Sequence, residues 1–269
     1  MAMVFEWLIN VHKIEAHQTW KMLFFGFFYS FLAAIFALFI LPKFAGPVML
    51  ALTMIAFVPV TFNLMREEEW KEETHQRYGI KHMLFKEHWP AMKFFIFMFI
   101  GMLVAYVVLF LFLPQTYATN LFSMQLDIIA SRNVQLGTII GSSALLPILV
   151  NNLKVLVMGL LLSLIYGVGA IFILSWNATI LGALVGSILK HTSTPLVAGR
   201  FLLHGIPEIT AYFIAGLAGG IISIAAARHK LTEPEFKEVV KDAIELVLLA
   251  IALMIISAFI EVYISPFIG

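Results

Sequence analysis

Long apolar runs separated by short polar segments make up most of the chain. Several runs reach roughly 18 residues or more, the length that an α-helix needs to cross about 30 Å of hydrocarbon. The pattern therefore predicts membrane-spanning helices. Their expected ranges are 22–41, 46–65, 91–113, 153–174 and 206–227, followed by a last helix that begins near 232 and ends before Pro266.

Three polar or mixed segments flank these spans. Residues 1–21 carry an apolar stripe and tryptophans suited to an interface, which indicates either an amphipathic interfacial helix or a plain leader into the first span. Residues 66–93 are the most polar part of the chain, and Gly79 divides them into two predicted short helices. Residues 114–150 are moderately apolar and rich in Ser, Gln and Asn, so we expect one or two helices that are docked on the outer face of the membrane or dip into it.

The C-terminal part, 151–269, contains one segment of unusual length. The sequence "SWNA" at 175–178 predicts a tight turn, and 179–189 is then short for a crossing. That segment is either a thin span or a half-helix. The predicted fold is an all-α polytopic membrane protein with about six full spans and one short or half-spanning helix. The first three spans occupy 22–113.

The composition supports the membrane assignment. Hydrophobic residues make up 61% of the chain and charged residues 12%, whereas soluble domains carry about 25% charged residues. The basic residues are scattered among loops, which argues against a nucleic-acid partner. The absence of cysteine excludes disulfides, thiolate catalysis and thiolate metal sites. The expected environment is the lipid bilayer of the plasma membrane.

The distribution of Lys and Arg predicts the orientation, because cytoplasmic segments carry the excess of basic residues. With seven membrane segments and a cytoplasmic N-terminus, most of the 17 Lys and Arg residues fall in the inside segments 1–21, 66–93 and 228–241. The C-terminus is then external.

The stretch "HGIPEITAYFIAGLAGG" at 204–220 places two ionisable side chains in an apolar run. His204 and Glu208 share one helical face if the helix continues through Gly205. Pro207 offers another interpretation, in which the helix starts at the proline and Glu208 stabilises the positive end of the helix dipole. Ion binding or conduction, and a contact that locks two helices together, are further alternatives.

Counting residues places these groups near the outer boundary of the membrane. From Glu208 to Ala227 the helix rises roughly 28 Å, almost the full hydrocarbon thickness. The last helix runs the other way, so Glu261 lies near the outer boundary and Glu245 near the inner one. We therefore predict an outer polar cluster, which either binds an ion or solute or is structural, and Glu245 is a candidate inner gate. The members of the cluster are Asn151, Asn152, Asn177, His204, Glu208 and Glu261.

Small residues repeat at a spacing of four in the same region. Such stripes let helix backbones approach closely in lipid, so they indicate packing within the chain or, as a minority interpretation, contact between copies. The residues are Gly182, Gly186, Ala211, Ala215, Gly216, Gly219 and Gly220.

The polar segment 66–93 contains a weak candidate metal site. Glu68, Glu72 and His75 include the Glu-x-x-His spacing of di-metal helical bundles, but those sites need a second copy of the motif. A solvated charged helix with Glu–Lys and Glu–Arg pairs is the favoured interpretation. No cofactor is predicted.

Three pieces of the C-terminal half resemble the stage II sporulation protein M family. The matched features are an Asn pair before a span, Asn177 followed by Gly182, a His-Gly-x-x-Glu, the small-residue run and a Glu before Pro, whereas Ala178 stands where glycine is expected. The pieces are "NNLKVLVMGLLLSLIYGVGAIFILSWNATILGALVG" (151–186), "HGIPEITAYFIAGLAGG" (204–220) and "EVYISP" (261–266). The resemblance implies a multi-pass protein without known catalytic activity. In sporulating bacteria the family is associated with a complex that recruits cell-wall hydrolases.

Two functions are open on these residues. The sequence contains no His-Glu-x-x-His, Gly-x-Ser-x-Gly or Walker loop, so we expect no enzyme. The first function is a homo-oligomeric channel or transporter for an ion or small solute, indicated by the ionisable groups at the membrane boundaries and the short segment 179–189. The alternative is a non-catalytic scaffold that binds protein partners through 66–93 or 114–150.

Overall fold

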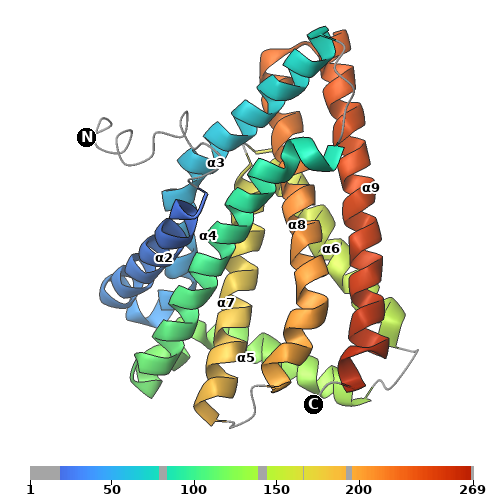
Figure 1. Cartoon of the computed structure of the whole chain (residues 1–269). Helices are drawn as coiled ribbons and strands as arrows, with labels where there is room; N and C mark the ends of the chain where they lie inside the picture. The colour runs from blue at the N-terminus through green and yellow to red at the C-terminus, as the bar shows by residue number, and fades with distance from the viewer. Residues whose placement is uncertain (1–18, 79–83, 139–143, 166, 192–195, 268–269) are drawn as a thin grey trace.

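A computed structural model describes residues 19–78, 84–138, 144–165, 167–191 and 196–267. Within these ranges, the side chains of 72–78, 84–87, 132–138, 191 and 196–202 are not described. The regular elements of the described residues are all helical (Figure 1). They are α2 (Lys21–Ile40), η2 (Pro42–Phe44), α3 (Ala45–Tyr78), α4 (Leu84–Phe112), α5 (Gln115–Thr138), α6 (Leu145–Ser163), α7 (Val168–His191), α8 (Leu196–Arg228), α9 (Pro234–Tyr263) and η4 (Ser265–Phe267).

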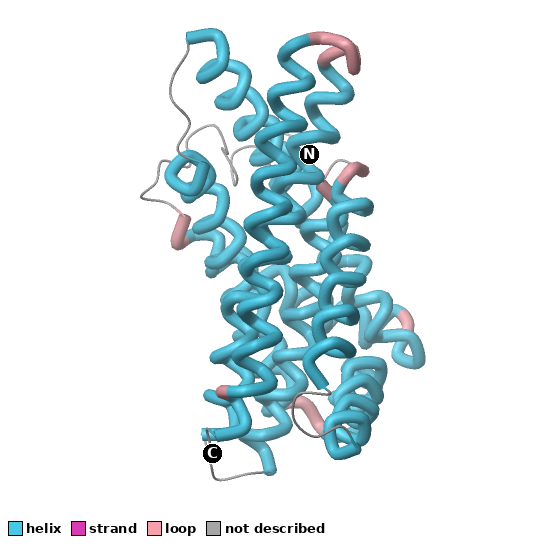
Figure 2. The backbone as a smooth tube through the Cα atoms, turned by 90° about the vertical axis from the view of Figure 1, so that its right-hand side faces the viewer, coloured by secondary structure: helices cyan, strands magenta, loops and turns pink. Residues whose placement is uncertain are grey.

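Seven of these helices are long and apolar enough to cross a membrane, namely α2, α3, α4, α6, α7, α8 and α9. The prediction of an all-α polytopic membrane protein is therefore confirmed. The helix α5, which falls in the segment 114–150, lies across the lower end of the bundle in Figure 1 and is seen nearly end-on after the quarter turn of Figure 2. At that lower end α8 begins and α9 ends, whereas the upper end contains the connection from α8 to α9.

The helices approach one another closely where small residues meet large ones. A Cβ atom added at Gly182 on α7 would lie 2.5 Å from the Cβ of Tyr106 on α4, and one at Gly186 would lie 2.7 Å from the Cβ of Phe110. The glycines of α8 contact other helices of the same chain, because Gly216 faces Ala170, Gly219 faces α6 and Gly220 faces Met65. Ala211 and Ala215 are also fully buried. These stripes therefore line contacts within one chain.

The boundary between α6 and α7 differs from the prediction. The helix α6 ends at Ser163, Gly167 takes the left-handed value φ = 74°, and α7 begins at Val168. The predicted span 153–174 and the turn at 175–178 are therefore wrong. Glycine adopts positive φ without steric cost, so it supplies the break. The segment 179–189 is the second half of a full-length helix, and it is neither a thin span nor a half-helix.

The start of α8 also differs from the interpretation in which the helix begins at Pro207. The helix begins at Leu196 and contains Pro207 in its interior, so a helix start at Pro207 is wrong. His204 and Glu208 consequently lie one turn apart on a continuous helix.

The polar segment 66–93 forms the ends of two long helices instead of two separate short ones. The helix α3 continues to Tyr78 and α4 begins at Leu84, while Gly79 lies outside the described residues. The predicted amphipathic helix at 1–21 also lies outside them, apart from its last three residues.

Candidate functional site

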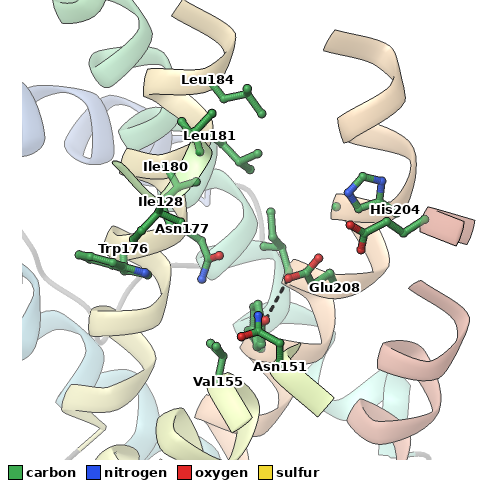
Figure 3. A pocket seen from close by; sticks show the side chains of 15 residues that line it. Ile128, Asn151, Val155, Trp176, Asn177, Ile180, Leu181, Leu184, His204 and Glu208 are labelled. Carbon is green, nitrogen blue, oxygen red and sulfur yellow. Dashed lines mark hydrogen bonds between the residues drawn. The ribbon is translucent and has the colours of Figure 1, made fainter. Parts of the chain in front are cut away.

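A cavity of about 350 Å³ lies at the lower end of the bundle, between α5, α6, α7, α8 and α9 (Figure 3). One side of its lining is apolar, with side chains from α5 and α7 that include Ile128, Ile180 and Leu184. The polar groups of the lining include Asn151 from α6, Asn177 from α7, His204, Glu208 and Tyr212 from α8, and Glu261 from α9. Five residues of the predicted polar cluster therefore share one cavity.

His204, Glu208 and Glu261 form the most closely spaced group in the cavity. One nitrogen or oxygen atom from each of the three side chains lies within 4.8 Å of the others. His204 is 9% exposed, and both glutamates are partly buried. Two carboxylates this close repel each other unless a proton or a cation lies between them. The arrangement can therefore hold positive charge.

Three hydrogen bonds fix the positions of these groups. The Tyr212 hydroxyl donates to Glu208 Oε1 at 2.9 Å. The Nδ1 atom of His204 lies 3.1 Å from the Ser265 hydroxyl, which is carried by η4. The Ser257 hydroxyl on α9 donates to the backbone carbonyl of His204 at 2.8 Å. The helices α8 and α9 are thus held together directly beside the cavity.

The two asparagines of the cavity have their amide groups engaged with protein oxygens. The Nδ2 atom of Asn177 donates to the carbonyl of Ile173 at 2.9 Å, and Nδ2 of Asn151 donates to Oδ1 of Asn152 at 3.4 Å. Because a side-chain amide offers one carbonyl oxygen besides its NH₂ group, the acceptor oxygens are what these residues can present to the cavity.

Two other residues that the sequence analysis selected do not line the cavity. Asn152 is buried next to the cavity but does not line it. Glu245 is exposed on α9 and is not among the described residues that line the cavity, and its role as an inner gate stays a prediction. The sequence analysis did not select Tyr212, Ser257 and Ser265. Tyr212 stands four residues after Glu208, and Ser257 and Ser265 stand four residues before and after Glu261. Residues four apart lie on one face of a helix, so this spacing is the signal that finds Tyr212 and Ser257.

A second polar cluster occupies the upper end of the bundle. Glu69 on α3 has no exposed surface and binds Arg228, at the end of α8, while its Oε1 atom lies 3.2 Å from His229 Nε2. Its neighbour Glu68 is 1% exposed and lies 2.8 Å from His88 Nδ1 on α4. The cluster therefore connects three helices, α3, α4 and α8.

At Glu68 and Glu69, these contacts correct the interpretation of the segment 66–93 as a solvated helix. Glu68 and Glu69 are buried, because the end of α8 and the start of α4 cover them. Glu68 also binds Lys71. The side chains of Glu72 and His75, the other two residues of the weak metal motif, lie outside the described residues.

Comparison of the sequence with known proteins shows which protein family it matches. The sequence model of "Stage II sporulation protein M" matches residues 91–266, which is more than half of the chain and includes every residue that lines the cavity. An uncharacterized protein of Methanocaldococcus jannaschii is 39% identical over 123 residues, which cover 44% of this chain and 69% of that protein. No solved structure matches the chain significantly. With its long apolar helices and this match from α4 to η4, the chain belongs to the stage II sporulation protein M family of membrane proteins.

Proposed function

We propose that this protein is a non-catalytic, homo-oligomeric channel or transporter that admits an ion or small solute through the cavity between α5 and α9. The observation that supports the proposal is the group of ionisable and amide side chains at His204, Glu208, Glu261 and Asn151, inside helices that are long and apolar enough to span a membrane. Ionisable side chains within spans are costly, and they normally face a water-filled cavity or a substrate path.

The position of the cavity suggests which end of the protein the solute enters. Glu208 lies in the first half of α8 and Glu261 near the end of α9, so both stand in the lower half of the bundle. The rise from Glu208 to Arg228 is roughly 30 Å, about one hydrocarbon thickness. We therefore propose entry from the lower end, with the cavity as the first binding site.

Tyr212 is the residue that we propose closes the inward side of the cavity. It lies one helical turn deeper along α8 than Glu208, is 2% exposed, and donates its hydroxyl hydrogen bond to that carboxylate. This hydrogen bond links the position of the aromatic ring to that of the Glu208 carboxylate, so a change of charge at Glu208 can be passed to the ring.

A flux assay tests the proposal. Purified protein is reconstituted in liposomes, and uptake of monovalent and divalent cations is compared with that of protein-free liposomes. We expect flux above that background, and we expect Glu208→Gln and Glu261→Gln each to reduce it about tenfold or more, as the loss of one charged ligand would do.

The matched control for these variants is Glu238→Gln. Glu238 is an exposed carboxylate on α9 outside the cavity, so its neutralisation should leave flux unchanged. Absence of flux for every cation tested would refute transport of these ions. Flux that is insensitive to both cavity variants would refute the assignment of the site. Native mass spectrometry of the detergent-solubilised protein counts the copies in the proposed oligomer.

A non-catalytic scaffold is the second candidate function. One observation favours it, since α3 continues to Tyr78 and so extends past its apolar part through the charged residues that begin at Arg66. A pull-down of envelope proteins that depends on 66–93 or 114–150, together with an absence of flux, would favour the scaffold.

A further inference from the structure

We propose that His204, Glu208 and Glu261 bind one divalent cation of the first transition row, of which Zn²⁺, Mn²⁺ and Fe²⁺ are the best matches. This inference deepens the proposed function, because it names the class of ion that the cavity accepts. Binding can be measured without flux, so the two proposals can fail separately.

The geometry is close to that of a three-ligand site. The three candidate ligand atoms lie within 4.8 Å of one another. Ligand bonds to Zn²⁺ are about 2.0–2.2 Å, which places tetrahedral ligands about 3.5 Å apart. A closure of roughly 1 Å, within reach of rotamer adjustments of two glutamates, therefore brings the three ligand atoms within bonding distance of one ion.

Two of the three ligands already have the outer hydrogen bonds that metal sites use. Nδ1 of His204 lies 3.1 Å from the Ser265 hydroxyl, and this contact orients the imidazole ring. The Tyr212 hydroxyl donates to Oε1 of Glu208 and thereby orients the carboxylate. Such partners fix the orientation and tautomer of a metal ligand, and their removal typically costs 10- to 100-fold in metal affinity.

The position of these partners in the fold supports a built site. Ser257 and Glu261 stand one turn apart on α9, and Ser257 binds the backbone of His204 itself. Ser265 is 1% exposed in η4, which follows α9 directly. The end of α9 therefore supplies one ligand and holds a second one in place.

The donor set selects the class of cation. One imidazole nitrogen with two carboxylates suits borderline ions such as Zn²⁺, Fe²⁺ and Mn²⁺, whereas sites for Ca²⁺ and Mg²⁺ are built from oxygen alone. Two carboxylates and one neutral imidazole carry a charge that a divalent cation balances. The cavity also provides the amide oxygens of Asn151 and Asn177 and room for water, which can complete the coordination.

The test measures binding to the purified full-length protein in detergent. The protein is stripped with a chelator and titrated with Zn²⁺ in a calorimeter, and with Co²⁺, whose visible absorption reports a low-symmetry nitrogen and oxygen environment. We expect one saturable ion per chain, and Mn²⁺ to bind more weakly than Zn²⁺, following the usual order of stabilities.

The variants separate this site from other histidines of the chain. Glu208→Gln and Glu261→Gln should each weaken Zn²⁺ binding by about 100-fold, and Ser265→Ala by about 10-fold with an altered Co²⁺ spectrum. Glu245→Gln should change neither. Helix content and a single size-exclusion peak establish that each variant is folded, and Ser265→Ala gives a reading even if a glutamate variant does not fold.

The outcomes are distinct. Absence of saturable binding overturns the inference, because the carboxylates would then share only a proton. Binding that survives both glutamate substitutions also overturns it, because the ion would then reside on other histidines. Zn²⁺ binding without flux supports the metal site and refutes transport. Flux of monovalent cations that depends on Glu208, without binding of Zn²⁺, Mn²⁺ or Co²⁺, supports transport and overturns the metal site.

Discussion

Glu69 is a carboxylate with no exposed surface, and its contacts carry a clear prediction at the scale of a single residue. Arg228 and His229 both bind it. Removal of one partner of a buried ion pair leaves charge without compensation and costs about 3–5 kcal/mol. The Arg228 side chain is 39% exposed, so water can take over part of its solvation. We expect Glu69→Ala to lower the free energy of unfolding by about 2 kcal/mol.

Reversible unfolding in mixed micelles, followed by helix content, measures this change. The control is Glu238→Ala, because Glu238 forms a pair with Lys241 in which both side chains are largely exposed. Its free energy of unfolding should change by less than about 0.5 kcal/mol. Equal effects of the two substitutions would mean that the upper cluster contributes no more than a surface pair.

The two charged clusters differ in how far sequence could locate them. Glu208 and Glu261 could be assigned to one end of the bundle, because the rise of a helix per residue is fixed and the span boundaries are marked by polar residues. Burial of Glu69 could not be foreseen, since its partner Arg228 stands 159 residues further along the chain. Only the packing of α8 against α3 brings them together.

At the scale of elements, Gly182 controls the contact between α7 and α4. A methyl group there would meet the Tyr106 side chain at 2.5 Å, whereas a methyl group at Gly205 on α8 would meet nothing within 4 Å. Both glycines lie inside helices, so alanine gains about 1 kcal/mol of helix propensity at either position. Overpacking costs about 1–3 kcal/mol.

We therefore expect Gly182→Ala to be destabilising and Gly205→Ala to be neutral or stabilising. The difference between the two variants in midpoint of unfolding isolates the packing cost, because the gain in propensity is common to both. If the two midpoints rise equally, the close approach of α7 to α4 is absent in the membrane-extracted protein.

The elements themselves were predicted unequally well from the sequence. The first long apolar run gives α2 to within one residue at each end, because no charged residue interrupts it after Lys21. The third run gives the end of α4 to within one residue, but α4 begins at Leu84, seven residues before the predicted start, in the polar segment. The turn at 175–178 was wrong because Asn177 bonds back to the carbonyl of Ile173, which satisfies its amide within a continuous helix. The true break at Gly167 is flanked by apolar residues, so the hydrophobic pattern contains no signal for it.

At the scale of the whole molecule, the two ends of the bundle face opposite sides of the membrane, and an odd number of spans would place the start of α2 and the end of α9 on opposite sides as well. The lower end carries the cavity with η4, and the upper end carries the buried Glu68 and Glu69 cluster. The excess of Lys and Arg falls in segments at the upper end, which predicts that this end is cytoplasmic. The cavity would then open to the exterior.

The absence of cysteine makes this orientation directly testable with single substitutions in an unmodified background. The three variants are Lys230→Cys, Tyr117→Cys and Phe267→Cys. Lys230 lies in the exposed connection between α8 and α9, while Tyr117 and Phe267 are exposed at the lower end. In intact cells a membrane-impermeant maleimide should label the latter two variants, and it should label Lys230→Cys only after permeabilisation. The reverse pattern would turn the cavity towards the cytoplasm and make the proposed uptake an export route. Equal labelling of Lys230→Cys and Phe267→Cys in intact cells would contradict an odd number of crossings from α2 to α9, because α9 alone separates these two positions along the chain.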